Sequence, residues 1–301
     1  MLRQRLLPWV VRAAWAVLPL AAGPGLGAAL DPRSRPVQLV ATALAWGGWA
    51  AGLVASLVPS PIALTVLRLV APGALLAAAA AALTGEASAA AVAVAAGASA
   101  VALALVLLPE TAEHFVNGAA YPNERRFPLR APAPLLLGVA PLAWALCVGP
   151  PVAAALVLAA RGWVLGGVLA AIAGPASVVL ARALHGLSRR WLVFVPAGVV
   201  VHDPIGLADP VLFRRQVIAA LAPAEVGTDA LDLTQRAPGL ALQITLREEV
   251  PLTRTTPGQR GGDPVAPTAL LVAPARPGAV LREAASRRLP TTPPPPSGAG
   301  R

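Results

Sequence analysis

Two carboxylates and one histidine in a single polar segment have the clearest potential for chemistry in this chain. Glu110, Glu113 and His114 are spaced i, i+3, i+4, so a helix would bring them to one face. Such a face can bind a divalent metal ion or move a proton. The spacing is equally typical of a solvated helix end, and no second carboxylate and histidine pair is present to complete a two-metal site. These residues are therefore metal candidates in an alternative reading, and we expect neither a bound metal nor a cofactor.

The same polar segment continues into a basic stretch flanked by aromatic residues and prolines. Residues 121–130 read Tyr-Pro-Asn-Glu-Arg-Arg-Phe-Pro-Leu-Arg. Further on, an arginine pair followed by tryptophan at residues 189–191 is typical of the cytoplasmic end of a membrane span. We predict contacts with lipid headgroups or with a protein for these stretches and for a later arginine pair, with the candidates Arg125, Arg126, Arg130, Arg189, Arg190, Trp191, Arg214 and Arg215.

The composition indicates a membrane protein. Of the 301 residues, 56% are hydrophobic, whereas soluble domains average roughly 45 to 50%. All 24 basic residues are arginine, so a GK[ST] phosphate loop, a lysine Schiff base and a lysine general base are excluded. Cys147 is the single cysteine, which excludes an intramolecular disulfide and a CxxC pair. The net charge of +10 comes largely from arginines that flank apolar segments, so we predict no nucleic-acid partner.

Six segments have the length and apolar character of membrane spans. A span needs about 20 apolar residues, and this condition is met by residues 7–30, 37–59, 61–84, 87–108, 134–159 and 163–187. The first segment also fits a cleaved signal peptide, because Arg3 and Arg5 precede an apolar run that ends in small residues. Gly48 and Gly52 have the GxxxG spacing, which we assign to packing inside the bundle.

The distribution of arginines predicts the orientation of these spans. With six spans, the segments on the side of the termini would hold Arg3, Arg5, Arg125, Arg126, Arg130, Arg189 and Arg190. The opposite loops would hold Arg33, Arg35 and Arg161. Because positive loops stay in the cytoplasm, this bias predicts a multi-pass protein of the bacterial inner membrane with both termini cytoplasmic.

Beyond residue 188 the sequence pattern changes from helix to strand. Residues 191–195 and 199–203 are β-branched and aromatic, and Pro-Ala-Gly lies between them, so a β-hairpin is predicted. Short apolar groups follow, and then a helix over residues 276–288. We therefore predict an α+β membrane protein with three parts: a helical bundle at 1–187, a small antiparallel β domain with a C-terminal helix at 188–289, and a disordered tail at 290–301. Residues 253–263 are also predicted to be disordered.

Three stretches resemble the bacterial pleckstrin-homology-like (PH-like) domains. They are the hairpin Trp-Leu-Val-Phe-Val-Pro-Ala-Gly-Val-Val-Val, the predicted strand Phe-Arg-Arg-Gln-Val-Ile and the ending Leu-Leu-Val-Ala-Pro-Ala-Arg-Pro-Gly-Ala-Val-Leu-Arg-Glu. The resemblance covers residues 190–288, and the whole chain looks similar to uncharacterised multi-span membrane proteins of actinobacteria. It implies a role in binding or assembly.

These observations lead to one expected function and two alternatives. We expect a non-enzymatic integral membrane protein whose PH-like domain binds an unidentified protein partner or organises a membrane assembly. The first alternative is a small transporter or membrane enzyme that uses Glu110, Glu113, His114 and Glu124. The second is a sensor of anionic lipids that uses Arg126, Arg214 and Arg215. The oligomeric state is left open.

Overall fold

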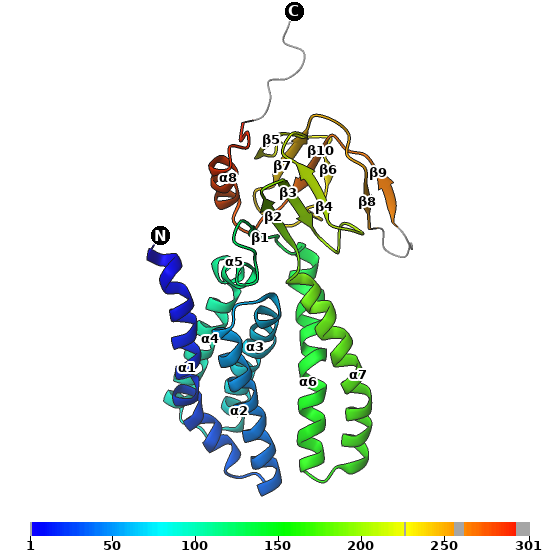
Figure 1. The fold of residues 1–301 in the computed structure, drawn as a ribbon. Coiled ribbons are helices and arrows are strands. Elements are labelled where there is room, and N and C mark those ends of the chain that lie inside the picture. The colour runs from blue at the N-terminus through cyan, green and yellow to red at the C-terminus, as the bar shows by residue number, and fades with distance from the viewer. Residues whose placement is uncertain (1, 226, 256–261, 293–301) are drawn as a thin grey trace, which may run out of the picture. The chain divides into compact units, whose positions relative to one another are not determined.

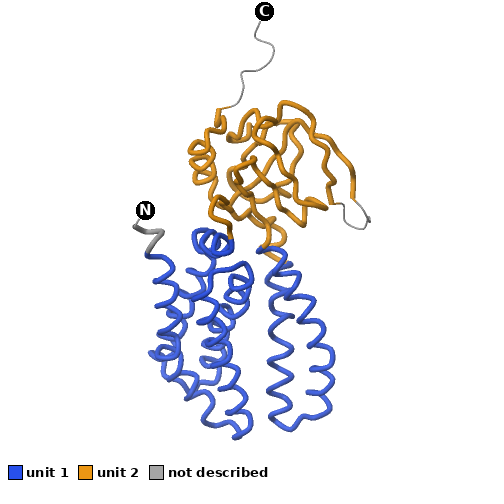
Figure 2. Tube along the Cα trace, viewed as in Figure 1, with its two compact units in different colours: residues 1–119, 139–188 blue, residues 120–138, 189–301 orange. Residues whose placement is uncertain are grey.

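The chain folds into two compact units (Figure 1). Figure 2 shows them in different colours: the helical unit comprises residues 1–119 and 139–188, and the β unit comprises residues 120–138 and 189–301. The structure is a computed structural model that describes residues 2–225, 227–255 and 262–292, with side chains from Leu6 onward. Residues 256–261 and 293–301, which were predicted to be disordered, lie outside the described residues.

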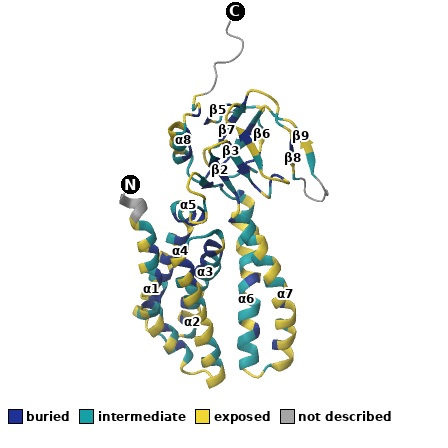
Figure 3. Ribbon diagram, viewed as in Figure 1, coloured by how far each residue is buried: buried dark blue, intermediate teal, exposed yellow. Residues whose placement is uncertain are grey.

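The helical unit contains six helices that are long and apolar enough to cross a membrane. They are α1 (Leu2–Leu30), α2 (Arg35–Leu57), α3 (Pro61–Thr84), α4 (Ala89–Leu107), α6 (Ala140–Ala159) and α7 (Trp163–Leu187). A short π-helix, η1 (Leu135–Val139), precedes α6. Many of their apolar side chains are exposed (Figure 3), as expected of surfaces that face lipid, among them Leu20 (79%) and Leu83 (90%). The six helices lie where the spans were predicted, and their length and composition are those of a multi-pass membrane protein.

Serine and glycine set the limits of two of these helices. The Ser60 hydroxyl accepts a hydrogen bond from the Ala63 amide at the start of α3, and Ser88 does the same at the start of α4. Gly85 ends α3 in the left-handed conformation with φ 74°. Serine caps satisfy amides that have no partner within the helix, and glycine adopts positive φ without strain.

Polar groups inside the bundle pair with one another. The Trp15 indole donates to the Trp49 carbonyl at 2.7 Å, and the Trp49 indole donates to the Trp15 carbonyl at 3.0 Å, which ties α1 to α2. A side chain at Gly52 would collide with the Trp15 ring, so Gly52 does serve packing within the bundle. Between α6 and α7, the Ser177 hydroxyl donates to the Cys147 carbonyl at 2.7 Å.

The β unit is built from three small sheets and one helix. The first sheet has the order β1-β2-β3-β4, all antiparallel: β1 (Arg125–Pro128), β2 (Trp191–Val195), β3 (Gly198–His202) and β4 (Val211–Arg214). The second has the order β5-β7-β10-β6: β5 (Ile218–Pro223), β7 (Leu242–Leu246), β10 (Ala269–Val272) and β6 (Leu231–Asp232). The third pairs β8 (Leu252–Arg254) with β9 (Asp263–Val265), and the helix is α8 (Pro277–Ser286). The α+β class is confirmed, although β6 and β10 run parallel.

One core joins the first two sheets and α8. Its members share near-complete burial and include Phe127, Phe194, Val199, Phe213, Leu221, Ile244, Leu270 and Val280. Val280 and Ala284, four residues apart on α8, are both fully buried, so this short helix closes one side of the core. The core therefore draws on strands from both of the chain segments that form the β unit.

Strand β1 is the main difference from the predicted domain boundaries, because residues 125–128 were expected in the loop between the fourth and fifth spans, within the helical domain. Its residues pair with β2, with Phe127 opposite Leu192 and Pro128 opposite Trp191. The Phe127 ring packs edge-to-face on Phe194 at 5.6 Å. Residues 125–128 of the basic stretch 121–130 therefore belong to the sheet of the C-terminal segment.

Two further expectations need correction. The predicted strand Phe213–Ile218 is wrong, because a turn after Arg214 sends β4 and β5 into different sheets. The ends of the segment 253–263 were predicted to be disordered, but they belong to the paired strands β8 and β9. The predicted hairpin is confirmed. Glycine is required at residue 198, because its φ is 155° and a side chain there would collide with the Phe213 carbonyl.

The pairing of β1 with β2 predicts that the segments before α6 and after α7 lie in the same compartment, because a sheet cannot form across a bilayer. In a full-length chain with Cys147 replaced by alanine, single cysteines at Asn123 and Ser286 should react with a membrane-impermeant maleimide from the same side. A cysteine at Ala160, between α6 and α7, should react from the other side. Labelling of Asn123 and Ser286 from opposite sides in vesicles would contradict the fold.

Candidate interaction site on the β unit

The metal-ligand candidates Glu110, Glu113 and His114 lie on a separate short helix, α5 (Pro109–Asn117). The backbone of Leu108, between α4 and α5, is not helical, so α5 does not continue α4. Glu113 is buried, whereas Glu110 and His114 are partly exposed. Across the described part of the chain, no three His, Cys, Asp or Glu side chains are arranged to hold a metal ion. Within the described residues, the side chains of Glu110, Glu113 and His114 thus do not point towards a common position where a metal ion could bind.

His114 is nevertheless in an unusual environment. Its Nε2 atom is enclosed and has no hydrogen-bond partner, and its ring lies edge-to-face on Phe115 at 5.7 Å. Burial lowers the pKa of His114, and the positive charge of Arg12 lowers it further. The imidazole is therefore held in its neutral form at pH 7, which suits packing at this helix.

Arg190, predicted to contact lipid or protein, is instead an interior residue of the β unit. It is 2% exposed, and its guanidinium donates to both carboxylate oxygens of Asp203, each at 2.7 Å. A third bond reaches the Arg130 carbonyl at 2.9 Å, and the Ile205 amide donates to Asp203. The prediction failed because successive residues that lead into a strand point to opposite sides, so Arg189 is exposed and Arg190 is buried.

Removal of one partner of this buried pair should be costly. We expect Asp203→Ala to lower the free energy of unfolding of the β unit by about 3–5 kcal/mol, because it leaves a buried guanidinium without its counter-charge. Hydrogen exchange of β2 and β3 in the full-length protein measures this loss. As a control, Arg254→Ala, which breaks the 3.5 Å pair of this exposed arginine with Asp263, should cost less than about 1 kcal/mol. Equal effects would contradict the assignment.

Three other arginine candidates are engaged within the β unit. Arg130 donates to the Pro238 carbonyl at 2.9 Å, and Arg215 donates to the Arg287 carbonyl at 2.5 Å. Arg125 lies over the Phe127 ring at 5.7 Å. Arg189 and Arg214 are exposed. These contacts of the β unit therefore do not bring the predicted arginines together into one basic patch.

The structure does bring Arg126 and Trp191 together, on the side of the first sheet that faces away from the core. Strand alternation sends Phe127, Leu192 and Phe194 into the core and their neighbours to the opposite side. We call that side the outer face and define it by Arg126, Trp191, Val193, Val200, His202 and Leu212. Leu212 is 41% exposed on the edge strand β4, so that edge of the face presents apolar surface, whereas Val193 on β2 is buried.

Aromatic and charged groups are stacked at one end of the outer face. The Arg126 guanidinium lies 5.4 Å from the centre of the Trp191 ring, within the range of a cation–π contact. On β3, the His202 ring is tilted by 35° against the same tryptophan at 5.1 Å. Glu124 accepts two hydrogen bonds from Arg126, each at 3.1 Å. The tryptophan is thus held between a neutralised arginine and a histidine.

The charges of this site favour a neutral surface. Desolvation by itself would raise the pKa of Glu124, but hydrogen bonds from Arg126 and the Tyr121 amide, with the charge of Arg126, lower it overall. Burial lowers the pKa of His202, the charges of Arg189 and Arg126 add to this, and Asp203 opposes it. At pH 7 the site therefore contains a neutral histidine and an arginine paired with a carboxylate, with the charge of the exposed Arg189 nearby.

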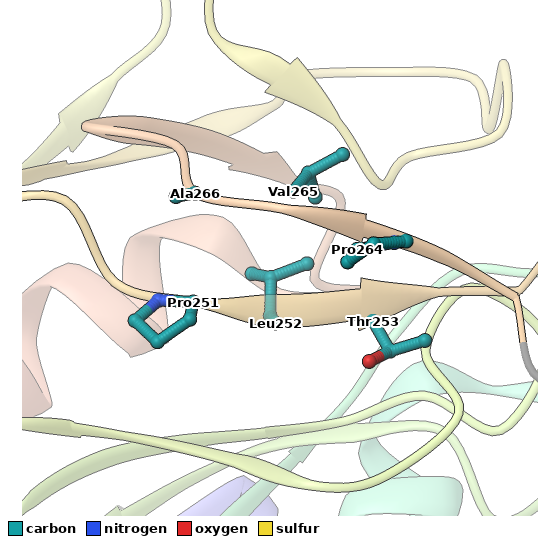
Figure 4. A pocket seen from close by; sticks show the side chains of 6 residues that line it. All are labelled: Pro251, Leu252, Thr253, Pro264, Val265 and Ala266. Carbon is teal, nitrogen blue, oxygen red and sulfur yellow. The ribbon is translucent and has the colours of Figure 1, made fainter.

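A shallow hollow of about 250 Å³ lies on the outer face, lined by Glu124, Trp191, Val193, Val195, Val200, His202 and Pro210. A larger hollow of about 360 Å³ lies along β8 and β9 (Figure 4). Its lining of Pro251, Leu252, Thr253, Pro264, Val265 and Ala266 contains no titratable side chain. The outer face is therefore the better candidate, because it combines apolar surface with a few positioned polar groups.

No protein-family model, curated protein or solved structure matches the chain. Arg126 and Trp191 were predicted as contact residues, whereas His202, Val200 and Leu212 were not predicted to share a site with them. The alternation of residues along the hairpin carried the signal for His202 and Val200. Leu212 required the register of β4.

The neutral His202 predicts a pH dependence of stability. Its folded pKa lies below the ordinary value near 6.5, so the unfolded chain binds the proton more readily. The stabilisation is present above that pH and is lost as the pH falls below it. His202→Gln should therefore reduce the loss of β-unit stability between about pH 7.5 and pH 5. Hydrogen exchange of β2 and β3 is the readout, and His114→Gln in the helical unit is the control. An unchanged pH profile in His202→Gln would contradict this environment.

Proposed function

We propose that this chain is a membrane-anchored binding protein of the bacterial inner membrane, and that its β unit is a PH-like domain that binds a protein partner through the outer face. The observation that carries the proposal is the apolar, self-neutralised surface around Trp191. Tryptophan and arginine are enriched at the energetic centres of protein interfaces, where a neutral, desolvated surface is favourable. We propose no catalytic step.

The order of elements supports the PH-like assignment. A hairpin and the strand after it form three of the four strands of the first sheet, later strands form the second, and the helix α8 follows and packs Val280 and Ala284 into the core. Two features depart from the expected pattern: β1 comes from a distant segment, and β6 pairs in parallel with β10.

Charge favours a protein over anionic lipid as the occupant of the outer face. Arg126 is neutralised by Glu124, and the pKa of His202 is lowered by burial and by nearby arginines. A headgroup site needs uncompensated cationic donors. The outer face instead offers the partly exposed Val200 and the exposed Leu212 as apolar surface beside Trp191, above the buried Val193.

The orientation of the spans belongs to the same proposal. An even number of spans separates the N-terminus from β1, and two more separate β1 from β2. The N-terminus and the β unit are then on one side. That side carries most of the arginines flanking the spans, so we place it in the cytoplasm.

A site-specific photocrosslinker tests the binding proposal. Incorporated at Val200 in the full-length chain in its native membrane, it should form one discrete protein adduct. Trp191→Ala should reduce that adduct about tenfold or more, as expected for an interface centre. The matched control Gln216→Ala, an exposed change in the turn between β4 and β5, should leave it unchanged.

A crosslinker at Ser286, exposed on α8, serves as the positional control and should not give the same adduct. Melting of the β unit establishes that Trp191→Ala is folded. Adducts with lipid alone, or a protein adduct that is insensitive to Trp191→Ala, would overturn the proposal.

A further inference from the structure

Arg68 is a cation within a helix of membrane-span length that has no carboxylate partner. It lies seven residues beyond Pro61, the first residue of α3, which is about 10 Å along the helix axis. Across the described residues, its guanidinium forms no ion pair. Its Nη1 atom makes a long contact of 3.4 Å with the Ser188 hydroxyl, and its Nε atom is enclosed without a hydrogen-bond partner. Uncompensated charge at this depth is expensive, so it marks a functional group.

The Arg68 side chain bends back towards the end of the bundle where α3 begins and α7 ends. Thr65, one turn earlier on α3, contacts His185 Nδ1 at 2.8 Å. Arg68 reaches Ser188, which lies three residues after His185 and immediately follows the last residue of α7. Since the two helices run in opposite directions along this contact, the guanidinium has moved outward along the bundle, towards the depth of lipid headgroups.

The hydroxyl groups of Thr65 and Ser188 are hydrogen-bonded in a way that leaves the positive charge of Arg68 without a counter-charge. The Thr65 hydroxyl donates to the Pro61 carbonyl at 3.0 Å, so its oxygen accepts from His185 Nδ1. The Ser188 hydroxyl accepts from Arg68 and keeps its own proton for another acceptor. Arg68 as a residue is partly exposed, whereas its Nε atom is enclosed and Ser188 is 6% exposed, so an anion would enter a largely desolvated site.

We propose that Arg68 and Ser188 form a binding site for a phosphate group at this end of the helical unit. The planar guanidinium offers parallel N–H donors that match phosphate oxygens, and the serine hydroxyl adds a third donor. The phosphate belongs to an anionic phospholipid headgroup or to a free phosphate ion. The site is independent of the outer face, because it uses residues of the helical unit alone.

Native mass spectrometry of the purified full-length protein tests this site. Titration with phosphatidylglycerol should show one bound lipid that phosphatidylcholine does not replace at equal concentration. Arg68→Gln should weaken that binding about tenfold or more. Arg182→Gln, which removes an exposed arginine of α7, should change it less than about twofold. A parallel titration with inorganic phosphate identifies the source: displacement of the lipid supports the site with free phosphate as a ligand, and no displacement assigns the lipid.

A second variant covers the case in which Arg68→Gln does not fold. Ser188→Ala keeps the guanidinium and should weaken phosphatidylglycerol binding several-fold. The proposal is overturned if Ser188→Ala and the folded Arg68→Gln bind as the unaltered protein does, if Arg182→Gln has an equal effect, or if phosphatidylcholine binds equally well.

Discussion

The pairing of β1 with β2 joins a segment that precedes two membrane helices to one that follows them. Arg190 Nη1 donates to the Arg130 carbonyl across 60 residues of chain, and the chain between them runs through α6 and α7. Closing so long a loop costs conformational entropy. That cost is offset only when Phe127 and Leu129 enter the core of the β unit. The β unit can therefore reach its complete form only after α6 and α7 have folded back on each other as a hairpin.

The outer face depends on the same closure. Arg126 and Glu124 come from the segment before α6, whereas Trp191 and His202 come from the segment after α7. Neither segment contains the site by itself. The buried pair of Arg190 and Asp203 lies immediately beside two of these residues in sequence, and it fixes which way they point. With Arg190 turned inward, strand alternation turns Trp191 to the opposite side. Interior electrostatics thus sets the geometry of the surface site.

Local pattern was sufficient for the helices and for the first hairpin, and insufficient for pairing at a distance. A membrane span is recognised from its own 20 or so residues, which explains why α3 and α7 were predicted with correct ends. Arg125–Pro128 has no strand pattern of its own, because its extended state comes from β2. The roles of Arg189 and Arg190 were likewise hidden, since two adjacent arginines look identical in sequence until the sheet decides which is buried. The contact of Arg68 with Ser188 joins residues 120 positions apart, which no local pattern reveals.

These dependencies determine which form of the molecule can bind. A fragment that begins at Arg189 would lack β1, and β2 would become an edge strand with unpaired amides and carbonyls. Phe194 would lose the Phe127 ring that packs on it, and Arg190 would lose the Arg130 carbonyl. Trp191 would also lose the Arg126 guanidinium that covers one side of its ring. Such a fragment would present an adhesive edge that the full-length chain does not have, so contacts it makes through that edge would report on the truncation rather than on the outer face.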